Sequence, residues 1–424
     1  GALALSMDEV DVDNSIYKVN EVALKNTTIR FTQTKVPPAS PADTAALALQ
    51  FGLRKARLDN VALTYRNQPS AQYLSTRIGE GEVTADNIDL LNSRVALNKL
   101  TLRNSTIAYA QNEDVPTEQR VVNPAKTVRD LDAAVKSATG QESSWAVSLR
   151  ESDISGLAVT FDNFDEPRQQ TKVRGLDYNH LRFSNLTLNT ENLRYSENST
   201  TGRITQLSGQ EQSGFAVTRA QADVVFDSTE TRLSNLDLVT PHTRIRRLLA
   251  MRYQSLDAIA DDLPNLGLEA DLRDTRLGFR DILYLAPELI DTPPFTTGPN
   301  QSVLLSGKES GRVGDLRLRG LEIVGLRNTQ FVGSGRIKGL PETDRRLYAD
   351  LTIKKFVTTA ADVRSLVPPG TIPAGYSLPP LMSVSGTFAG RPTALVFDTD
   401  LRATTSYGNL AAKVNVGAGP VGQE

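Results

Sequence analysis

The chain has 424 residues and a formal net charge of -2, because its 47 Lys and Arg residues nearly balance its 49 Asp and Glu residues. This balance argues against a nucleic-acid-binding protein, which would carry an excess of positive charge. The chain contains no cysteine, which excludes disulfides, cysteine-ligated metal centres and thiol nucleophiles. His180 and His242 are the two histidines, and they lack the spacing of a helical pair of metal ligands. We therefore expect no metal and no cofactor.

Hydrophobic residues make up 39% of the chain and aromatic residues 6%. These fractions are low for a well-filled globular core, yet the chain is too apolar to be disordered. The composition therefore favours an elongated and repetitive architecture. The longest uncharged run, 365–390, contains several prolines and so predicts no membrane-spanning helix. The first residues lack the features of a signal peptide, and we expect any such signal to lie upstream.

Three windows share apolar residues at positions 1, 3, 8 and 10. They begin at Val22, Leu100 and Leu186 and read VALKNTTIRF, LTLRNSTIAY and LTLNTENLRY. We expect the polar middle of each window to form a hairpin turn, which would place its four apolar side chains on one face of a sheet. The residues predicted in this way to line an apolar groove are Val22, Leu24, Ile29, Phe31, Leu100, Leu102, Ile107, Tyr109, Leu186, Leu188, Leu193 and Tyr195.

A second pattern alternates with the first. It reads LRKARLDNVALTY from Leu53 to Tyr65 and LRESDISGLAVTF from Leu149 to Phe161. Asp59-Asn60 and Ser155-Gly156 are predicted as tight turns within it. Apolar and polar residues continue to alternate between these windows, which predicts roughly twenty or more short antiparallel strands.

Four segments are predicted as short helices, namely Thr127 to Lys136, Ser255 to Leu263, Asp281 to Leu289 and Ala360 to Leu366. The predicted fold class is therefore all-β, an elongated antiparallel β-sheet groove with a few short helices. We expect residues 1–424 to form one continuous repetitive body with a soft joint at 112–144. Alternation alone does not separate a closed β core from an open groove, because both need one apolar face on each strand.

Signals for catalysis are weak. Asp8, Asp11 and Asp13 lack the Gly turn and the distal Glu of a calcium loop, which favours a solvated strand edge. The glycines from Gly333 to Gly339 lack the Lys-Ser/Thr ending of a phosphate loop. The chain has neither a nucleophile elbow nor an HExxH motif. We therefore expect a protein that is not an enzyme.

The last third of the chain carries further patterns. FVGSGRIKGLP runs from Phe331 to Pro341, TTAADVRSLVPP from Thr358 to Pro369, and RDILYLAPEL from Arg280 to Leu289. The segment from Val384 to Val416 joins GTFAG to alternating apolar residues. With the repeated windows, these patterns resemble the TamB family within the AsmA-like group, best over residues 300–416. The resemblance covers most of the chain, which lacks the family's inner-membrane helix and its C-terminal domain.

The resemblance implies the periplasmic part of an inner-membrane-anchored protein that belongs to the translocation and assembly module of Gram-negative bacteria. Such a protein acts in outer-membrane biogenesis. Its repeating β-groove, or β-taco, would carry the acyl chains of phospholipid between the inner and outer membranes, in partnership with an Omp85-type barrel protein.

Two other functions remain open. The chain could be a chaperone or scaffold for the insertion of outer-membrane β-barrel proteins, with peptide in place of lipid as its cargo. It could also be a carbohydrate-active β-solenoid, but Trp145 is its only tryptophan, which argues against a stripe of sugar-stacking aromatic residues.

A chain built in this way should have a radius of gyration well above the ~22 Å of a compact protein of this length, because its strands recur without a compact aromatic core. Small-angle scattering measures this quantity. A value near 22 Å would contradict the elongated architecture.

Overall fold

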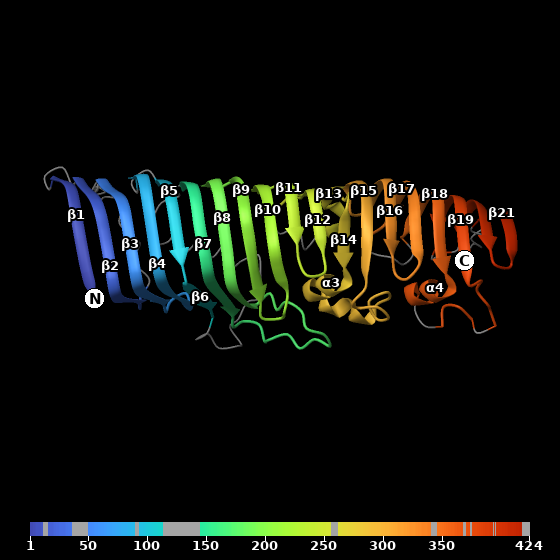
Figure 1. The fold of residues 1–424 in the computed structure, drawn as a ribbon, viewed down its shortest axis with the longest axis horizontal. Coiled ribbons are helices and arrows are strands. Elements are labelled where there is room, and N and C mark those ends of the chain that lie inside the picture. The colour runs from blue at the N-terminus through green and yellow to red at the C-terminus, as the bar shows by residue number, and fades with distance from the viewer. Residues whose placement is uncertain are drawn as a thin grey trace, which may run out of the picture. The chain divides into compact units, whose positions relative to one another are not determined.

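The computed structural model describes residues 1–11, 16–35, 50–89, 93–112, 145–255, 262–340, 346–367, 370–373, 375–392, 394 and 396–417. These residues form two compact units. Unit 1 comprises residues 1–170 and 176–227, and unit 2 comprises residues 171–175 and 228–424. Strands dominate both units, and Figure 1 shows the strands of each unit running side by side. The predicted all-β class is confirmed.

In unit 1 the part of the chain that the structure describes forms strands β1 to β10. They are β1 (Ala2–Asp11), β2 (Ile16–Gln33), β3 (Gln50–Asn67), β4 (Gln72–Asp89), β5 (Arg94–Arg103), β6 (Thr106–Gln111), β7 (Ala146–Asn163), β8 (His180–Ser196), β9 (Ser199–Glu211) and β10 (Ala216–Asp227). Each strand pairs with the next in space, and β5 and β6 together occupy one position between β4 and β7.

In unit 2 the described residues form further strands and short helices. The strands are β11 (Glu230–Val239), β12 (Arg244–Arg252), β13 (Gly267–Asp271), β14 (Thr275–Gly278), β15 (Ser302–Arg312), β16 (Asp315–Gly325), β17 (Thr329–Lys338), β18 (Tyr348–Thr359), β19 (Leu381–Arg391), β20 (Val396–Thr405) and β21 (Gly408–Val416). They pair in chain order, and β13 and β14 share one position between β12 and β15.

The short helices follow strand ends. Among the described residues the helices are α3 (Phe279–Leu285) and α4 (Ala360–Leu366), with 3₁₀ turns η2 (Leu263–Asn265) and η3 (Pro287–Asp291). Helix α4 matches its predicted range, and α3 with η3 matches the predicted helix at 281–289 to within a few residues. The predicted helix at 127–136 lies outside the described residues, as does most of the one at 255–263. The predicted joint at 112–144 also lies outside them, apart from residue 112.

The predicted hairpin turns are wrong. In each window the chain runs straight on through the polar middle and does not fold back on itself. The window at Val22 lies inside β2, the one at Leu186 lies inside β8, and the one at Leu100 runs through β5 and β6. Asp59-Asn60 and Ser155-Gly156 likewise lie inside β3 and β7. The strands are consequently longer than predicted.

Residues with a left-handed backbone take the place of these turns. Asn26 and Asn60 have φ of 49° and 51°, and Gly156 has φ of 63°. The register between β2 and β3 passes over Asn26 and Asn60, whose side chains hydrogen-bond at 2.8 Å. A left-handed residue within a strand acts like a bulge, because it shifts the alternation of faces by one residue without reversing the chain. Here the partner strand passes over a matching residue, so the register itself does not shift. Asn tolerates the left-handed conformation both in turns and within strands. A hairpin turn and a left-handed residue inside a strand therefore look alike in the sequence.

Most strand pairs are antiparallel, as predicted, but unit 1 departs from this pairing at two places. Strands β2 and β3 pair in parallel, and so do β5 and β6 with β7. A parallel pair needs a crossover connection that returns the chain to the same end of the sheet. The connections at these two places, 34–49 and 112–145, are long enough for such a crossover. The sheet of unit 1 is therefore mixed, whereas every pairing in unit 2 is antiparallel.

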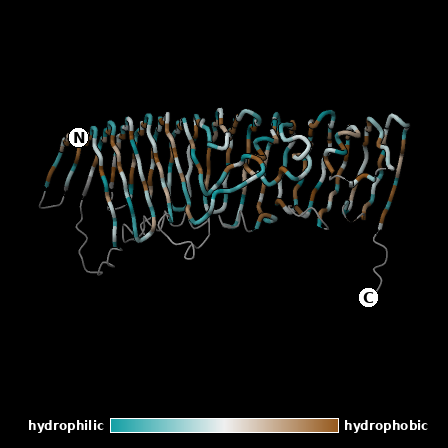
Figure 2. Tube along the Cα trace, turned by 90° about the horizontal axis from the view of Figure 1, so that it is seen from below, coloured by the Kyte–Doolittle hydropathy of each residue, from teal (hydrophilic) through white to brown (hydrophobic). Residues whose placement is uncertain are grey.

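Within the part of the chain that the structure describes, each unit is a single layer of sheet. Extensive contacts between strands join only hydrogen-bonded neighbours, and α3 and α4 contact β14 and β18, the strands that they follow. Figure 2 shows hydrophobic and hydrophilic positions alternating along many of the strands. A fold with two packed layers would bury one face of each sheet against the other layer. Among the described elements no second layer does so.

The bulge at Asn60 generates the first structural test. Asn60→Ala should lower the free energy of unfolding by about 1–2 kcal/mol, because alanine disfavours a left-handed backbone. Asn60→Gly should cost less, since glycine accepts this conformation although it also loses the hydrogen bond to Asn26. Urea unfolding followed by circular dichroism measures both changes. Equal losses for the two variants would show that the backbone conformation does not set the cost.

Candidate functional site

One row of apolar side chains crosses unit 1 at matched register positions. Its members are Leu24, Leu58, Gly81, Leu102, Ile154, Leu188, Leu207 and Ala220. Residues directly opposite each other on neighbouring strands point to the same face of a sheet. This row therefore gives strands β2 to β10 a common apolar face.

A second row on the same face is rich in aromatic residues. It consists of Phe31, Tyr65, Leu74, Tyr109, Phe161 and Leu181. The rings of Phe31 and Tyr65 stack with centroids 5.6 Å apart, and those of Tyr109 and Phe161 stack at 6.2 Å. Stacked aromatic pairs between adjacent strands stabilise a sheet beyond the area that they bury.

The bulges explain why both rows lie on one face. Leu24 and Ile29 are five positions apart and would point to opposite faces of a regular strand. The extra residue, Asn26, restores them to the same face. Asn104 does the same between Leu102 and Ile107. The register thus brings together, on one face, all the residues predicted from the three windows. That they line a groove for lipid stays a prediction.

This apolar face is incompletely buried. Phe31, Tyr195 and Ile29 are 57%, 46% and 39% exposed. The other nine predicted groove residues are partly exposed, and none is buried. Val61 and Ile154, which lie between them on the same face, are buried to 4% and 8% exposure. Neighbouring strands shelter the middle of the face, while no second layer of described residues covers it.

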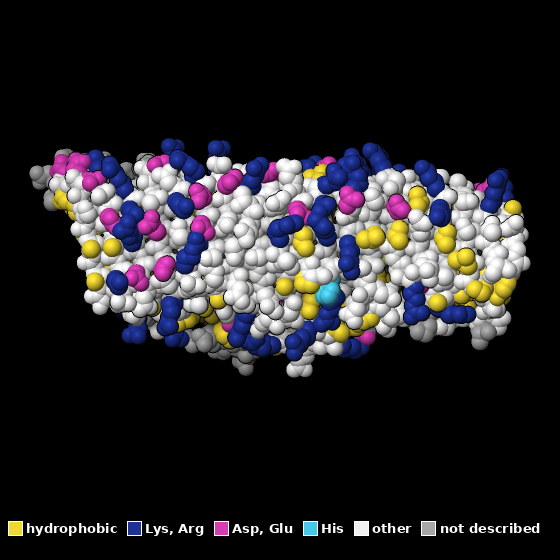
Figure 3. Space-filling view, in the orientation of Figure 1, with side chains coloured by type: hydrophobic (Ala, Val, Ile, Leu, Met, Phe, Trp, Pro, Cys, Tyr) yellow, Lys and Arg dark blue, Asp and Glu magenta, His cyan; other side chains and the backbone are white. Residues whose placement is uncertain are grey.

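The opposite face of unit 1 carries paired charges. Lys25 pairs with Asp59 at 3.0 Å, and Lys99 pairs with Glu151 at 2.8 Å. Arg103 pairs with Asp153, and its hydrogen bond lowers the pKa of that carboxyl group. Figure 3 shows Lys and Arg beside Asp and Glu over the N-terminal strands. Exposed pairs of this kind add little stability each. They keep this face hydrated and nearly neutral, in contrast to the apolar face.

Unit 2 repeats the apolar face with one exception. A row across its strands consists of Leu233, Leu249, Ala270, Glu309, Leu318, Gly335, Leu351, Phe388, Thr399 and Val414. Glu309 is the only ionisable residue of this row. Its two carboxyl oxygens are shielded from solvent and have no hydrogen-bond partner. Burial raises the pKa of Glu309 from an ordinary 4.5 to about 7.

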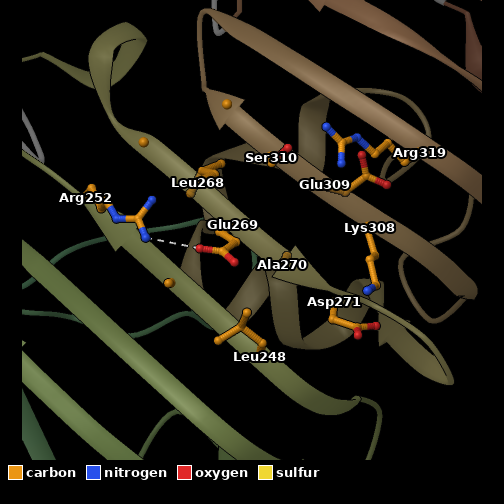
Figure 4. A pocket seen from close by; sticks show the side chains of 13 residues that line it. Leu248, Arg252, Leu268, Glu269, Ala270, Asp271, Lys308, Glu309, Ser310 and Arg319 are labelled. Carbon is orange, nitrogen blue, oxygen red and sulfur yellow. Dashed lines mark hydrogen bonds and ion pairs between the residues drawn. The ribbon is translucent and has the colours of Figure 1, made fainter.

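A cavity of about 610 Å³ lies over strands β12, β13, β15 and β16. Arg252, Glu269 and Lys308 line it from the charged face of unit 2, whereas the Glu309 side chain belongs to the apolar face. Figure 4 shows Glu309 among the charged side chains of these strands, with a contact joining Arg252 to Glu269. Glu269 also accepts a hydrogen bond from Arg232 at 3.1 Å, and Asp271 accepts one from Arg273 at 2.8 Å. The carboxylates of Glu269 and Asp271 thus have basic partners on the charged face, whereas Glu309, on the apolar face, has no hydrogen-bond partner among the described residues.

The two histidines lie in different units, each in a structural setting. His180 is buried, with Nδ1 3.0 Å from an Asp162 carboxylate oxygen and Nε2 2.8 Å from the carbonyl oxygen of Glu166. His242 is half-buried in the turn between β11 and β12. The described residues contain no cluster of His, Asp and Glu suited to a metal ion. No helix among them is long and apolar enough to cross a membrane.

Comparison with protein-family models, with curated proteins and with solved structures finds no match for this chain. The resemblance to the TamB family therefore depends on the sequence patterns alone.

Sequence reasoning missed Glu309, although one signal was available. Glu309 follows Val303, Leu305 and Gly307 at two-residue spacing in β15, so alternation already predicts it on the apolar face. The polar neighbours Lys308 and Ser310 make the end of β15 look like a solvated segment. The register with Ala270 and Leu318 is needed to show the contrast.

Glu309 generates a pH-dependent prediction. Because its pKa is raised in the folded state, the favourable contribution of the neutral carboxyl group is complete below about pH 4.5. It is lost progressively as the pH rises through about 7. Glu309→Gln removes this titration. Thermal melts at pH 5 and pH 8 should show a larger loss of stability at pH 8 for the wild-type protein than for the variant. Parallel changes in the two proteins would contradict the assignment.

Proposed function

We propose that the apolar face of this single-layer sheet holds the acyl chains of phospholipids and lets them pass between two membranes. The observation that carries this proposal is an apolar face that no second layer of described residues covers, with Phe31, Tyr195 and Ile29 between 39% and 57% exposed. A continuous apolar surface rimmed by polar residues is typical of a site that binds another apolar molecule.

The energetics favour such a cargo. Each buried methylene group contributes about 0.8 kcal/mol, so two acyl chains in water cost on the order of 20 kcal/mol unless something covers them. The apolar face could supply that cover without any specific site residue. Repetition of similar apolar rows, as at Leu24 and Leu102, would keep the binding energy similar from one strand to the next. A lipid could then move along the sheet without meeting a deep trap.

The setting of this function follows from the family resemblance. It supports a periplasmic setting, in which the chain would be part of a longer, inner-membrane-anchored protein that works with an Omp85-type barrel at the outer membrane. In this role the chain performs no catalysis. The alternative role, a chaperone for outer-membrane β-strands, would use the same apolar face for the side chains of an unfolded peptide.

Ile107 and Ala108 provide a matched pair of positions for the test. Ile107 lies in a row between Thr76 and Val159 on the apolar face. Ala108 points to the opposite face, between Ser75 and Thr160. Ile107→Asp should interrupt the apolar path at a cost of about 2 to 4 kcal/mol, by analogy with charges that face lipid. Ala108→Asp adds the same charge among polar neighbours and should leave lipid binding unchanged.

The measurement is the amount of phospholipid bound per chain after incubation with vesicles, quantified by mass spectrometry of an organic extract. Circular dichroism checks that each variant remains β-rich. The proposal expects bound lipid in the wild-type protein and in Ala108→Asp, with a severalfold loss in Ile107→Asp. An absence of lipid from the wild-type protein, with Ile107→Asp unfolded, would favour a closed core. Recovery of peptide in place of lipid would favour the chaperone.

A further inference from the structure

Two cations lie directly opposite each other on the charged face of unit 2. Lys308 on β15 and Arg319 on β16 are register partners, and both side chains are exposed. Figure 4 shows them on adjacent strands. Arg317 lies two residues before Arg319 in β16 and therefore points to the same face. Like charges directly opposite each other destabilise a sheet, so this arrangement calls for an explanation.

The carboxylates that border these cations are held by other arginines. Asp271, opposite Lys308 on β13, accepts a hydrogen bond from Arg273 at 2.8 Å, and the bonding to Arg273 lowers the pKa of Asp271 to about 2. Asp315, at the start of β16, pairs with Arg336 on β17. Neither carboxylate is therefore a dedicated partner of the cations on β15 and β16.

Within the part of the chain that the structure describes, these cations have no ion-pair partner of their own. Lys308, Arg317 and Arg319 form no ion pair and no side-chain hydrogen bond with the described residues. Glu269, a third carboxylate of this face, already accepts hydrogen bonds from two arginines. An anion bound between Lys308 and Arg319 would offset the repulsion between them.

A cavity with room for such an anion lies at the same place. Lys308 and Arg319 both line the cavity of about 610 Å³, and so does Ser310, two residues beyond Lys308 on the same face. Residues directly opposite each other have Cβ atoms about 5 Å apart, so one small group can meet both side chains. A phosphate group accepts several charge-assisted hydrogen bonds at once from Lys and Arg. The hydroxyl group of Ser310 can donate one more.

We propose that Lys308 and Arg319 bind a phosphate group on the charged face of unit 2. Arg317 adds a third positive charge beside them. The site is independent of the proposed function, because acyl chains on the apolar face would lie on the other side of the sheet. The phosphate group belongs either to a soluble compound or to the head groups of a bilayer surface, and the experiment distinguishes these two sources.

Lys308→Gln and Arg319→Gln are the test variants, because each removes one positive charge from an exposed side chain. Lys355→Gln is the control. Lys355 is an exposed cation of the same face, and it lies opposite Val332 on β17 where Lys308 has a cation. Calorimetry measures the affinity of each protein for pyrophosphate at constant ionic strength. Co-sedimentation measures binding of the same proteins to phosphatidylglycerol vesicles, and circular dichroism checks that each variant remains β-rich.

The wild-type protein and Lys355→Gln should bind the phosphate probe equally. Each test variant should bind it about tenfold more weakly, as expected for the loss of a hydrogen bond to a charged group. Loss of pyrophosphate binding in the test variants supports a soluble ligand, and loss of vesicle binding alone supports a bilayer surface. Absence of binding to both probes in the wild-type protein, or equal losses in Lys355→Gln and the test variants, would overturn the inference.

Thermal melts give a second readout that a purely structural role would not produce. Without phosphate and at low ionic strength, Lys308→Gln should melt at a higher temperature than the wild-type protein, because it removes a repulsion. Added pyrophosphate should raise the melting temperature of the wild-type protein more than that of the variant. A variant that is less stable than the wild-type protein without phosphate would show that Lys308 has a partner inside the protein, which would contradict the inference.

Discussion

Among the described residues a single layer of amphipathic sheet leaves its apolar face without a second protein layer, and the rest of the structure depends on this constraint. Folding stability normally comes from the burial of such a face against a second layer. Here the strands bury part of it against their neighbours, as at Val61 and Leu149, while Phe31 and Tyr195 stay exposed. The backbone hydrogen bonds between the long strands must then supply much of the stability of the sheet. A molecule that covers the face would stabilise the fold and occupy the site at once.

The bulges and the charged face follow from the same constraint. A left-handed residue within a long strand shifts the alternation of faces, so each bulge has to recur in the neighbouring strand if the apolar face is to stay continuous. Asn26 beside Asn60 meets this requirement in a parallel pair, and Asn104 beside Gly156 meets it in another. On the other face, cross-strand pairs such as Lys25 with Asp59 keep the sheet hydrated. Glu309 departs from this division of faces, which is why it stands out.

The sequence predicts some parts of this arrangement well. Alternation and the repeated windows identify strands and a shared apolar face, and the run before the prolines predicts α4 at its observed bounds. The hairpins were wrong because Asn60 adopts the same backbone conformation in a bulge as it does in a turn. The parallel pairing of β2 with β3 depends on which strands meet, and a local pattern holds no information on that. The isolation of Glu309 likewise appears only when Ala270 and Leu318 are placed beside it.

The most direct test of the central claim asks what touches the apolar face in a living cell. A photo-reactive side chain at position 188 would replace Leu188, which lies between Ile154 and Leu207 on that face. At position 187 it would replace Thr187, which points to the opposite face beside Ser208. The account predicts adducts with phospholipid at position 188 and none at position 187. Adducts with protein alone at position 188, or equal labelling by lipid at both positions, would contradict it.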